Sequence, residues 1–193
     1  MILYLHGFRS SPVSFKARKM AAHMKALGRS EEFLCPQLPD SPLAAMQMLE
    51  TTLAGCAASQ LTIIGSSLGG FYATWLAEKI GCKAILLNPA VQPPRDLVNY
   101  VGVTTAYHSD AVFEFKKEYV DQLRAYTVEN ITRPERYFLL AATGDEVLDW
   151  HEMVDHYPAA KQLIIQGSDH GMADFVDYLD QIMAFSDVAN DDA

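Results

Sequence analysis

The sequence is poor in basic residues and contains no long hydrophobic run. Its 193 residues include 15 Lys+Arg against 24 Asp+Glu, which gives a formal net charge of −9. A chain with this charge is a poor electrostatic partner for phosphate backbones and anionic lipids, so we expect neither nucleic-acid binding nor membrane binding. No apolar stretch approaches the ~18 residues of a membrane span, and no secretory signal precedes the first apolar run. We therefore expect a soluble, unexported protein.

Cysteine is scarce as well. The three cysteines, Cys35, Cys56 and Cys82, form no C-x-x-C pair, and an odd number of them cannot all pair within one chain. Reduced thiols of this kind are typical of the cytoplasm, where we expect the protein to reside.

The common metal and nucleotide motifs are also missing. The segment His151–His156 resembles the zinc motif H-E-x-x-H but is one residue too long. On a helix, a five-residue step turns the second ring ~140° away from the first, so the two rings do not share a face. No G-x-x-x-x-G-K-[ST] loop occurs, and Gly65, Gly69 and Gly70 do not fit G-x-G-x-x-G. We expect no metal and no organic cofactor.

The sequence does contain a regular alternation of short apolar runs and helical patterns. With 193 residues and 50% hydrophobic residues, the chain has the size and apolar content of a single domain. Strands covered on both faces form uninterrupted apolar runs. Such runs occupy residues 2–6, 61–65, 83–87, 137–142 and 162–166, with a weaker sixth at 32–35. We predict an α/β fold with six mainly parallel strands flanked by helices.

Residues 89–134 interrupt this alternation, because they separate two strands by far more than one crossover helix needs. Within this insertion, Phe115, Tyr119, Leu123 and Tyr126 follow one another at helical spacings of 4, 4 and 3. The insertion is either a helical excursion packed on the sheet edge or a cap over a site beyond the strand ends.

The boundaries of the domain and of two helices can be placed from local signals. The segment 187–193 is polar and acidic and has no apolar anchor, so we predict one domain over residues 1–186 and a flexible acidic tail after it. Ser11–Pro12 and Ser41–Pro42 have the pattern of an N-cap followed by a proline at the first helical position.

One motif carries chemistry. Residues Gly65–Gly69 read Gly-Ser-Ser-Leu-Gly, which is G-x-S-x-G with Ser67 at its centre. A strand pattern precedes it and a helical pattern follows, the context of a sharp turn that lifts a serine hydroxyl clear of the backbone and offers it to a base. Ser66 is the poorer candidate, since Ile64 then occupies a required glycine position. The N–H of Leu68, at the helix start, is expected to face a developing oxyanion.

His170 is the strongest candidate for the base that this serine needs. It lies in a polar, glycine-flanked loop after the last predicted strand, a position that none of the other five histidines shares. Asp145, Glu146 and Asp149 are the candidates for the acid that orients it. Asp149 is explained as a helix N-cap, whereas Asp145 follows a glycine in a tight loop and has no helix to cap. We therefore select Asp145, which gives the chain order Ser, Asp, His.

The loop after the first predicted strand reads His6-Gly7-Phe8-Arg9-Ser10. It resembles the His-Gly loop of α/β-hydrolases, which implies that the Phe8 N–H is the second donor to the oxyanion. We assign His6 and Gly7 to the support of this loop.

Several segments together resemble the small bacterial YqiA-type esterases of the α/β-hydrolase superfamily. These segments are Tyr4–Phe8, Pro36–Pro39, Gly65–Gly70 and Thr143–Asp149. The resemblance covers residues 1 to about 185 and is weakest in the insertion. It implies a compact α/β-hydrolase fold with the strand order 2-1-3-4-5-6, and a serine esterase with Ser67 as nucleophile, Asp145 as acid and His170 as base.

The expected substrate is a small-molecule carboxylic ester. We expect a small acyl group, because 193 residues leave little room for a deep tunnel. G-x-S-x-G does not encode the leaving group, so a thioesterase or an amidase with the same site is one alternative. The other is a hydrolase fold used as a binding protein without turnover.

Overall fold

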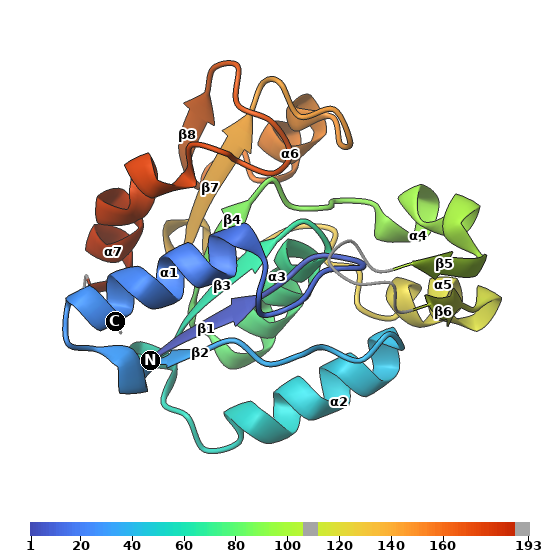
Figure 1. Cartoon of the computed structure of the whole chain (residues 1–193), viewed down its shortest axis with the longest axis horizontal. Coiled ribbons are helices and arrows are strands. Elements are labelled where there is room, and N and C mark those ends of the chain that lie inside the picture. Colours follow the sequence, from blue (N-terminus) through green and yellow to red (C-terminus); the bar gives the residue numbers. More distant parts are fainter. Residues whose placement is uncertain (106–111, 188–193) are drawn as a thin grey trace.

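The computed structural model describes residues 1–105 and 112–187. At its centre is a six-stranded sheet with the order β2-β1-β3-β4-β7-β8, in which every pair of neighbouring strands is parallel (Figure 1). The strands are β1 (Ile2–Leu5), β2 (Phe33–Leu34), β3 (Thr62–Ser66), β4 (Lys83–Leu87), β7 (Tyr137–Ala142) and β8 (Lys161–Ile165). Counted along the chain, they have the order 2-1-3-4-5-6, so the predicted sheet is confirmed.

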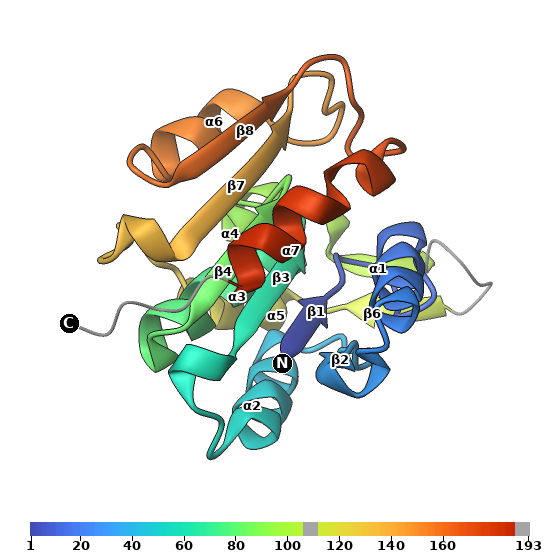
Figure 2. The ribbon, with the colours of Figure 1, turned by 90° about the vertical axis from the view of Figure 1, so that its left-hand side faces the viewer.

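Helices cover both faces of this sheet. The α-helices of the described residues are α1 (Phe15–Ala26), α2 (Pro42–Leu53), α3 (Leu68–Ile80), α4 (Pro93–Asp96), α5 (Lys117–Arg124), α6 (Trp150–His156) and α7 (Leu179–Asp187). Short 3₁₀ helices occur at Ser30–Glu32, Ala58–Gln60, Val98–Tyr100, Pro134–Arg136 and Phe175–Tyr178. Helices α1 and α7 pack on one face of the sheet, and α2, α3 and α6 pack on the other (Figure 2).

Alternate side chains of each strand enter two separate cores. In β1, Ile2 and Tyr4 pack with α1 and α7, whereas Leu3 and Leu5 pack with α2 and α3. Because both faces are covered by helices, consecutive residues of β1 and β7 are all apolar and buried. This is why the central strands have uninterrupted apolar runs in the sequence instead of alternating ones.

Of the two helix starts expected at Ser-Pro pairs, the one at Ser41–Pro42 is confirmed and the one at Ser11–Pro12 is wrong. The Ser41 side chain accepts a hydrogen bond from the Ala44 N–H at 3.3 Å and caps α2. Helix α1 begins only at Phe15, because hydrogen-bonded turns occupy the segment before it. These turns lengthen the loop after β1.

The insertion at residues 89–134 contains strands that the sequence analysis did not predict. The strands β5 (Gly102–Thr105) and β6 (Val112–Phe115) pair as an antiparallel hairpin, separate from the main sheet. In Figure 1 this hairpin lies with α4 and α5 on the side of the molecule toward which β1 points. The insertion therefore lies near the carboxyl ends of the central strands.

The helix predicted within the insertion is shorter than its spacing suggested. Phe115 belongs to β6 and α5 begins at Lys117, while Tyr126 follows the end of the helix. The spacing of four residues still brings aromatic rings together, since the ring centroids of Phe115 and Tyr119 are 5.5 Å apart. The same contact can be made across a strand-to-helix turn, which is why the spacing wrongly predicted that Phe115 belongs to the helix.

The C-terminal helix reaches the first residue of the expected tail. Asp187 ends α7, and its carboxylate pairs with Arg29 at 3.0 Å. The rest of the expected tail, residues 188–193, and residues 106–111 of the insertion lie outside the described residues. None of the helices in the described part of the chain has the length and the apolar character needed to cross a bilayer.

The close packing of α3 against β1 predicts that Gly69→Ala is strongly destabilising. A Cβ on Gly69 would lie 2.1 Å from the carbonyl oxygen of Leu5, and both partners are backbone, so neither can rotate away. We expect a loss of about 3 kcal/mol or more in the free energy of unfolding, measured by urea denaturation. Gly171→Ala is the control, because its Cβ would meet nothing nearer than 3.4 Å. Equal midpoints for the two variants would contradict the close approach.

Candidate active site

The strand order reverses between β1 and β3. The chain leaves β1 for α1 on one face of the sheet and leaves β3 for α3 on the other, so the loops after the two strands diverge and open a crevice at their carboxyl ends. The register pairs Leu5 with Gly65, which brings the loop that starts at His6 beside the turn at Ser67. A Cβ on Gly7 would lie 3.1 Å from the Cβ of Ser67, so the loop packs directly against the serine.

Ser67 occupies a strained turn between β3 and α3. Its φ of 54° and ψ of −122° are unusual for a residue with a side chain. The turn is tight enough that a Cβ on Gly65 would lie 2.3 Å from the carbonyl oxygen of Gly69. The Ser67 N–H donates to the Leu87 carbonyl at 3.1 Å, and its own carbonyl accepts from the Ala90 N–H at 3.0 Å. These contacts hold the backbone in a conformation that it would not adopt alone.

His170 and Asp145 form a hydrogen-bonded pair. The Nδ1 atom of His170 lies 2.7 Å from Oδ2 of Asp145, whose side chain is 0% exposed. The other carboxylate oxygen accepts hydrogen bonds from the N–H groups of Val147 and Leu148, each at 2.8 Å. With both oxygens bonded, the carboxylate is fixed against the imidazole, and the ring presents Nε2 as its remaining nitrogen.

Asn88 holds the backbone of the loop that carries His170. Its side chain is completely buried at the end of β4. The amide nitrogen donates to the carbonyls of Asp169 and His170 at 3.1 and 3.3 Å, and the amide oxygen accepts from the Ala142 N–H at 2.8 Å. Asn88 therefore connects the ends of β4, β7 and the loop after β8.

Lys16 supports the same loop from α1. Its ammonium group donates to the carbonyl oxygens of His170 at 3.2 Å and Gly171 at 2.9 Å, and the residue is only 8% exposed. Burial lowers the pKa of Lys16 to about 8, although nearby carboxylates oppose part of that change. On the opposite side of the loop, the Glu146 carboxylate accepts a hydrogen bond from the His170 N–H at 3.1 Å.

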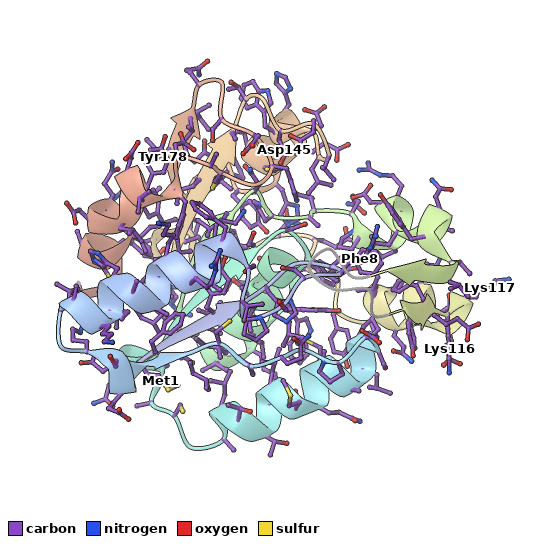
Figure 3. The ribbon with its side chains drawn as sticks, viewed as in Figure 1. Met1, Phe8, Lys116, Lys117, Asp145 and Tyr178 are labelled. Atoms are coloured by element: carbon purple, nitrogen blue, oxygen red, sulfur yellow. The ribbon has the colours of Figure 1, made fainter. Side chains whose placement is uncertain are left out.

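A cavity of about 390 Å³ opens where these loops meet. The residues that the sequence singled out as functional line this cavity with the exception of Asp145, which is buried against the His170 ring. Those that line it are His6, Gly7, Phe8, Ser67, Leu68 and His170. In Figure 3, Phe8 lies on the side of the insertion and Asp145 lies beyond the end of β7.

Ser67 and His170 share this cavity, although within residues 1–105 and 112–187 no hydrogen bond joins the serine hydroxyl to the imidazole. Catalytic hydrogen bonds are often long in a free enzyme and shorten when the substrate binds.

His6 connects the loop after β1 to the segment that precedes α2. Its Nε2 accepts a hydrogen bond from the Leu38 N–H at 3.1 Å, so the other nitrogen, 3.0 Å from the Gly7 carbonyl, carries the proton. Burial lowers the pKa of His6, which favours this neutral form. Both nitrogens are therefore engaged in holding the loop.

The helix-capping role expected of Asp149 is confirmed. Its carboxylate accepts a hydrogen bond from the His151 N–H at 2.9 Å at the start of α6 and lies 2.8 Å from the ring Nδ1 of the same residue. Asp149 thus contacts His151, and it is Asp145 that contacts His170.

Sequence reasoning missed Asn88 and Lys16. For Asn88 there was a usable signal, because a polar residue that follows a buried strand directly and precedes a proline is unusual. A lysine within a helix, in contrast, is ordinary, so no pattern singled out Lys16.

Comparisons with known proteins agree with this architecture. A model of the uncharacterised protein family UPF0227 matches residues 1–187. A solved structure from Agrobacterium vitis S4 is 16% identical, with a TM-score of 0.75 over 96% of this chain and 87% of that one. Mouse alpha/beta hydrolase domain-containing protein 10 is 15% identical, with a TM-score of 0.71 over 95% of this chain and 89% of that one. Est1E from Butyrivibrio proteoclasticus, solved with ferulic acid bound, is 13% identical, with a TM-score of 0.69 over 95% of this chain and 87% of that one. At these identities the structural likeness shows the fold, which is that of an α/β-hydrolase.

The hydrogen bonds of Asn88 predict that Asn88→Ala destabilises the protein. The change leaves the buried Ala142 N–H without an acceptor, which costs about 1–3 kcal/mol, whereas the carbonyls of Asp169 and His170 keep the Met172 N–H and the Lys16 ammonium group as donors. We expect a lower urea midpoint, with a loss of about 1–3 kcal/mol in the free energy of unfolding. Asn99→Ala, at an exposed position, is the control and should leave the midpoint unchanged. A wild-type midpoint for Asn88→Ala would contradict this role.

Proposed function

We propose that this chain, which belongs to the uncharacterised protein family UPF0227 and has the α/β-hydrolase fold, is a serine hydrolase that cleaves carboxylic esters. Its nucleophile in this proposal is Ser67, its base is His170 and its acid is Asp145. The substrate is a small-molecule ester, and the reaction uses neither a metal nor an organic cofactor.

The observation that carries the proposal is the arrangement of these three side chains. Ser67 projects from a strained turn into the same cavity as His170, and His170 is bonded through Nδ1 to the buried carboxylate of Asp145 at 2.7 Å. A carboxylate in this position keeps the proton on Nδ1, which leaves Nε2 free to accept the serine proton. A serine with this geometry and a base oriented by an acid are the parts that acyl transfer requires.

The proposed reaction proceeds through an acyl enzyme. The Ser67 oxygen attacks the ester carbonyl carbon while His170 accepts the serine proton. His170 then gives that proton to the leaving alkoxide, which departs as an alcohol and leaves the acyl group on Ser67. Water attacks the acyl carbon with His170 again as base, the carboxylic acid departs, and Ser67 regains its proton. Asp145 stabilises the imidazolium formed in each step.

The oxyanion that forms in both steps needs hydrogen-bond donors. We assign this role to the backbone N–H groups of Phe8 and Leu68, which belong to the loop after β1 and to the first turn of α3. Both residues line the cavity beside Ser67, which supports the assignment. The close packing of Gly7 on Ser67 also supports the assignment, because it brings the segment that contains Phe8 beside the turn.

The cavity supports a small acyl group. Its volume of about 390 Å³ is near the lower end of the ~300–1,000 Å³ typical of ligand pockets. Phe8, Leu97 and Tyr100 form an apolar wall, with the rings of Phe8 and Tyr100 in edge contact at 5.5 Å between centroids. Est1E, which has the same fold, accommodates ferulic acid.

We also propose a cytoplasmic location. Cys35, Cys56 and Cys82 are all free thiols in the structure, and reduced cysteines fit a reducing compartment.

We predict that Ser67→Ala removes ester hydrolysis and leaves the fold intact, because only a hydroxyl at the cavity surface is lost. The turnover of p-nitrophenyl acetate should fall by ~10³-fold or more. Ser66→Ala, one residue away, is the matched control and should lose far less. Unchanged turnover by folded Ser67→Ala would refute the mechanism.

A fluorophosphonate should add one equivalent to the wild-type protein and none to Ser67→Ala, as measured by mass spectrometry. A panel of ester, thioester and amide substrates identifies the preferred leaving group. No labelling and no turnover of any of them would mean that the fold serves binding only.

We predict that Asp145→Asn lowers kcat by up to ~10⁴-fold, because an amide no longer holds the imidazole in the required tautomer. Stability should change little, since the asparagine oxygen still accepts from the N–H groups of Val147 and Leu148. Asp149→Asn is the matched control and should retain both activity and stability, because asparagine caps a helix about as well as aspartate. Melting curves and kcat of the two variants, measured in parallel, test this. A dead Asp149→Asn beside an active Asp145→Asn would reassign the acid.

A further inference from the structure

The imidazole of His170 lies among several negative charges. Asp145 is bonded to its ring, Glu146 accepts from its backbone N–H, and Asp169 is the preceding residue. Asp174, in the same loop, is bonded to Ser168 and Tyr178. Carboxylates near an imidazole favour its protonated form. A protonated imidazole cannot accept the proton of a serine hydroxyl.

Lys16 is the cation that faces this cluster. Its ammonium group is bonded to the His170 carbonyl, and it interacts electrostatically with the carboxylates of Asp169, Asp145 and Glu146. Because Lys16 is buried, its charge is screened less by water than a surface lysine would be. A positive charge at this place disfavours a second positive charge on the imidazole.

Burial of an ammonium group is costly. The two backbone carbonyls need only hydrogen-bond donors, and a donor does not have to carry a charge. A glutamine at position 16 would also carry a hydrogen-bond donor at the end of a long side chain. The positive charge of Lys16 therefore needs an explanation beyond the hydrogen bonds that the side chain donates.

We propose that Lys16 is a positioning residue whose buried charge offsets the carboxylates around His170 and thereby supports the imidazole in its work as a base. This inference rests on the proposed function, in which His170 is the base. Lys16 does not touch the reacting atoms in this scheme and acts only through His170.

The first test is an NMR titration of His170, followed through its ring C2–H signal, in a Ser67→Ala background. The signal is assigned by its loss in His170→Gln. We compare Lys16→Gln, which removes the charge and keeps a donor, with Lys16→Met, which removes both. In each variant the titration midpoint should move to higher pH, because a positive charge that opposes a second one on the imidazole has been removed. Lys19→Met, on the same helix at an exposed position, is the matched control and should leave the midpoint unchanged.

The second test is the pH profile of kcat/KM, with Ser67 intact. The acid limb of Lys16→Gln should move to higher pH by the same amount, while the plateau at high pH stays within a few fold of the wild-type value. A purely structural role predicts the opposite pattern, in which the plateau falls and the limb does not move. That pattern, or an unmoved NMR midpoint in both folded variants, would overturn the proposal.

A measurement on the protein with Lys16 in place covers the case in which the variants do not fold. Because the pKa of Lys16 is lowered to about 8, the C2–H signal of His170 should show a second, smaller inflection near that pH as Lys16 loses its proton. A single inflection would refute the coupling. If the protein hydrolyses no ester at all, the proposed function fails, whereas the NMR titration still decides the role of Lys16.

Discussion

Leu5 and Gly69 bring two stretches of backbone into direct contact, and the geometry of the site follows from that contact. The first turn of α3 can approach the end of β1 only because residue 69 has no side chain. This approach aligns the turn at Ser67 with the loop that begins at His6, so that Phe8, Ser67 and Leu68 line one cavity. A shift of either element by the width of a methyl group would separate them.

Buried polar groups maintain this alignment at the carboxyl edge of the sheet. His6 ties the loop after β1 to Leu38, Asn88 ties β4 to β7 and to the loop after β8, and Lys16 ties α1 to that same loop. Apolar packing cannot hold these loops, because they carry backbone donors and acceptors that need partners. The loops of the site are therefore held by the hydrogen bonds of buried polar side chains.

Features with a local signal could be predicted from the sequence, and those that depend on distant partners could not. The central strands, the turn at Ser67 and the cap at Asp149 each have a pattern within a few residues. Lys16 acquires its role from a partner 154 residues away, which no local pattern reveals. Asn88 is marked as unusual by its place directly after a buried strand, but its partner 81 residues away has no local signal. Phe115 was misplaced because a contact between residues four apart does not distinguish a helix from a strand that turns into one.

The long separation between Lys16 and its partners also fixes the order in which the site can be assembled. During synthesis the segment with β1, α1 and the Ser67 turn leaves the ribosome about 100 residues before His170 does. Until β8 adds to the edge of the sheet, Asn88 and Lys16 have buried polar groups without their partners in the final loop. Asn88 and Lys16 therefore gain these partners only when the C-terminal quarter of the chain joins the sheet.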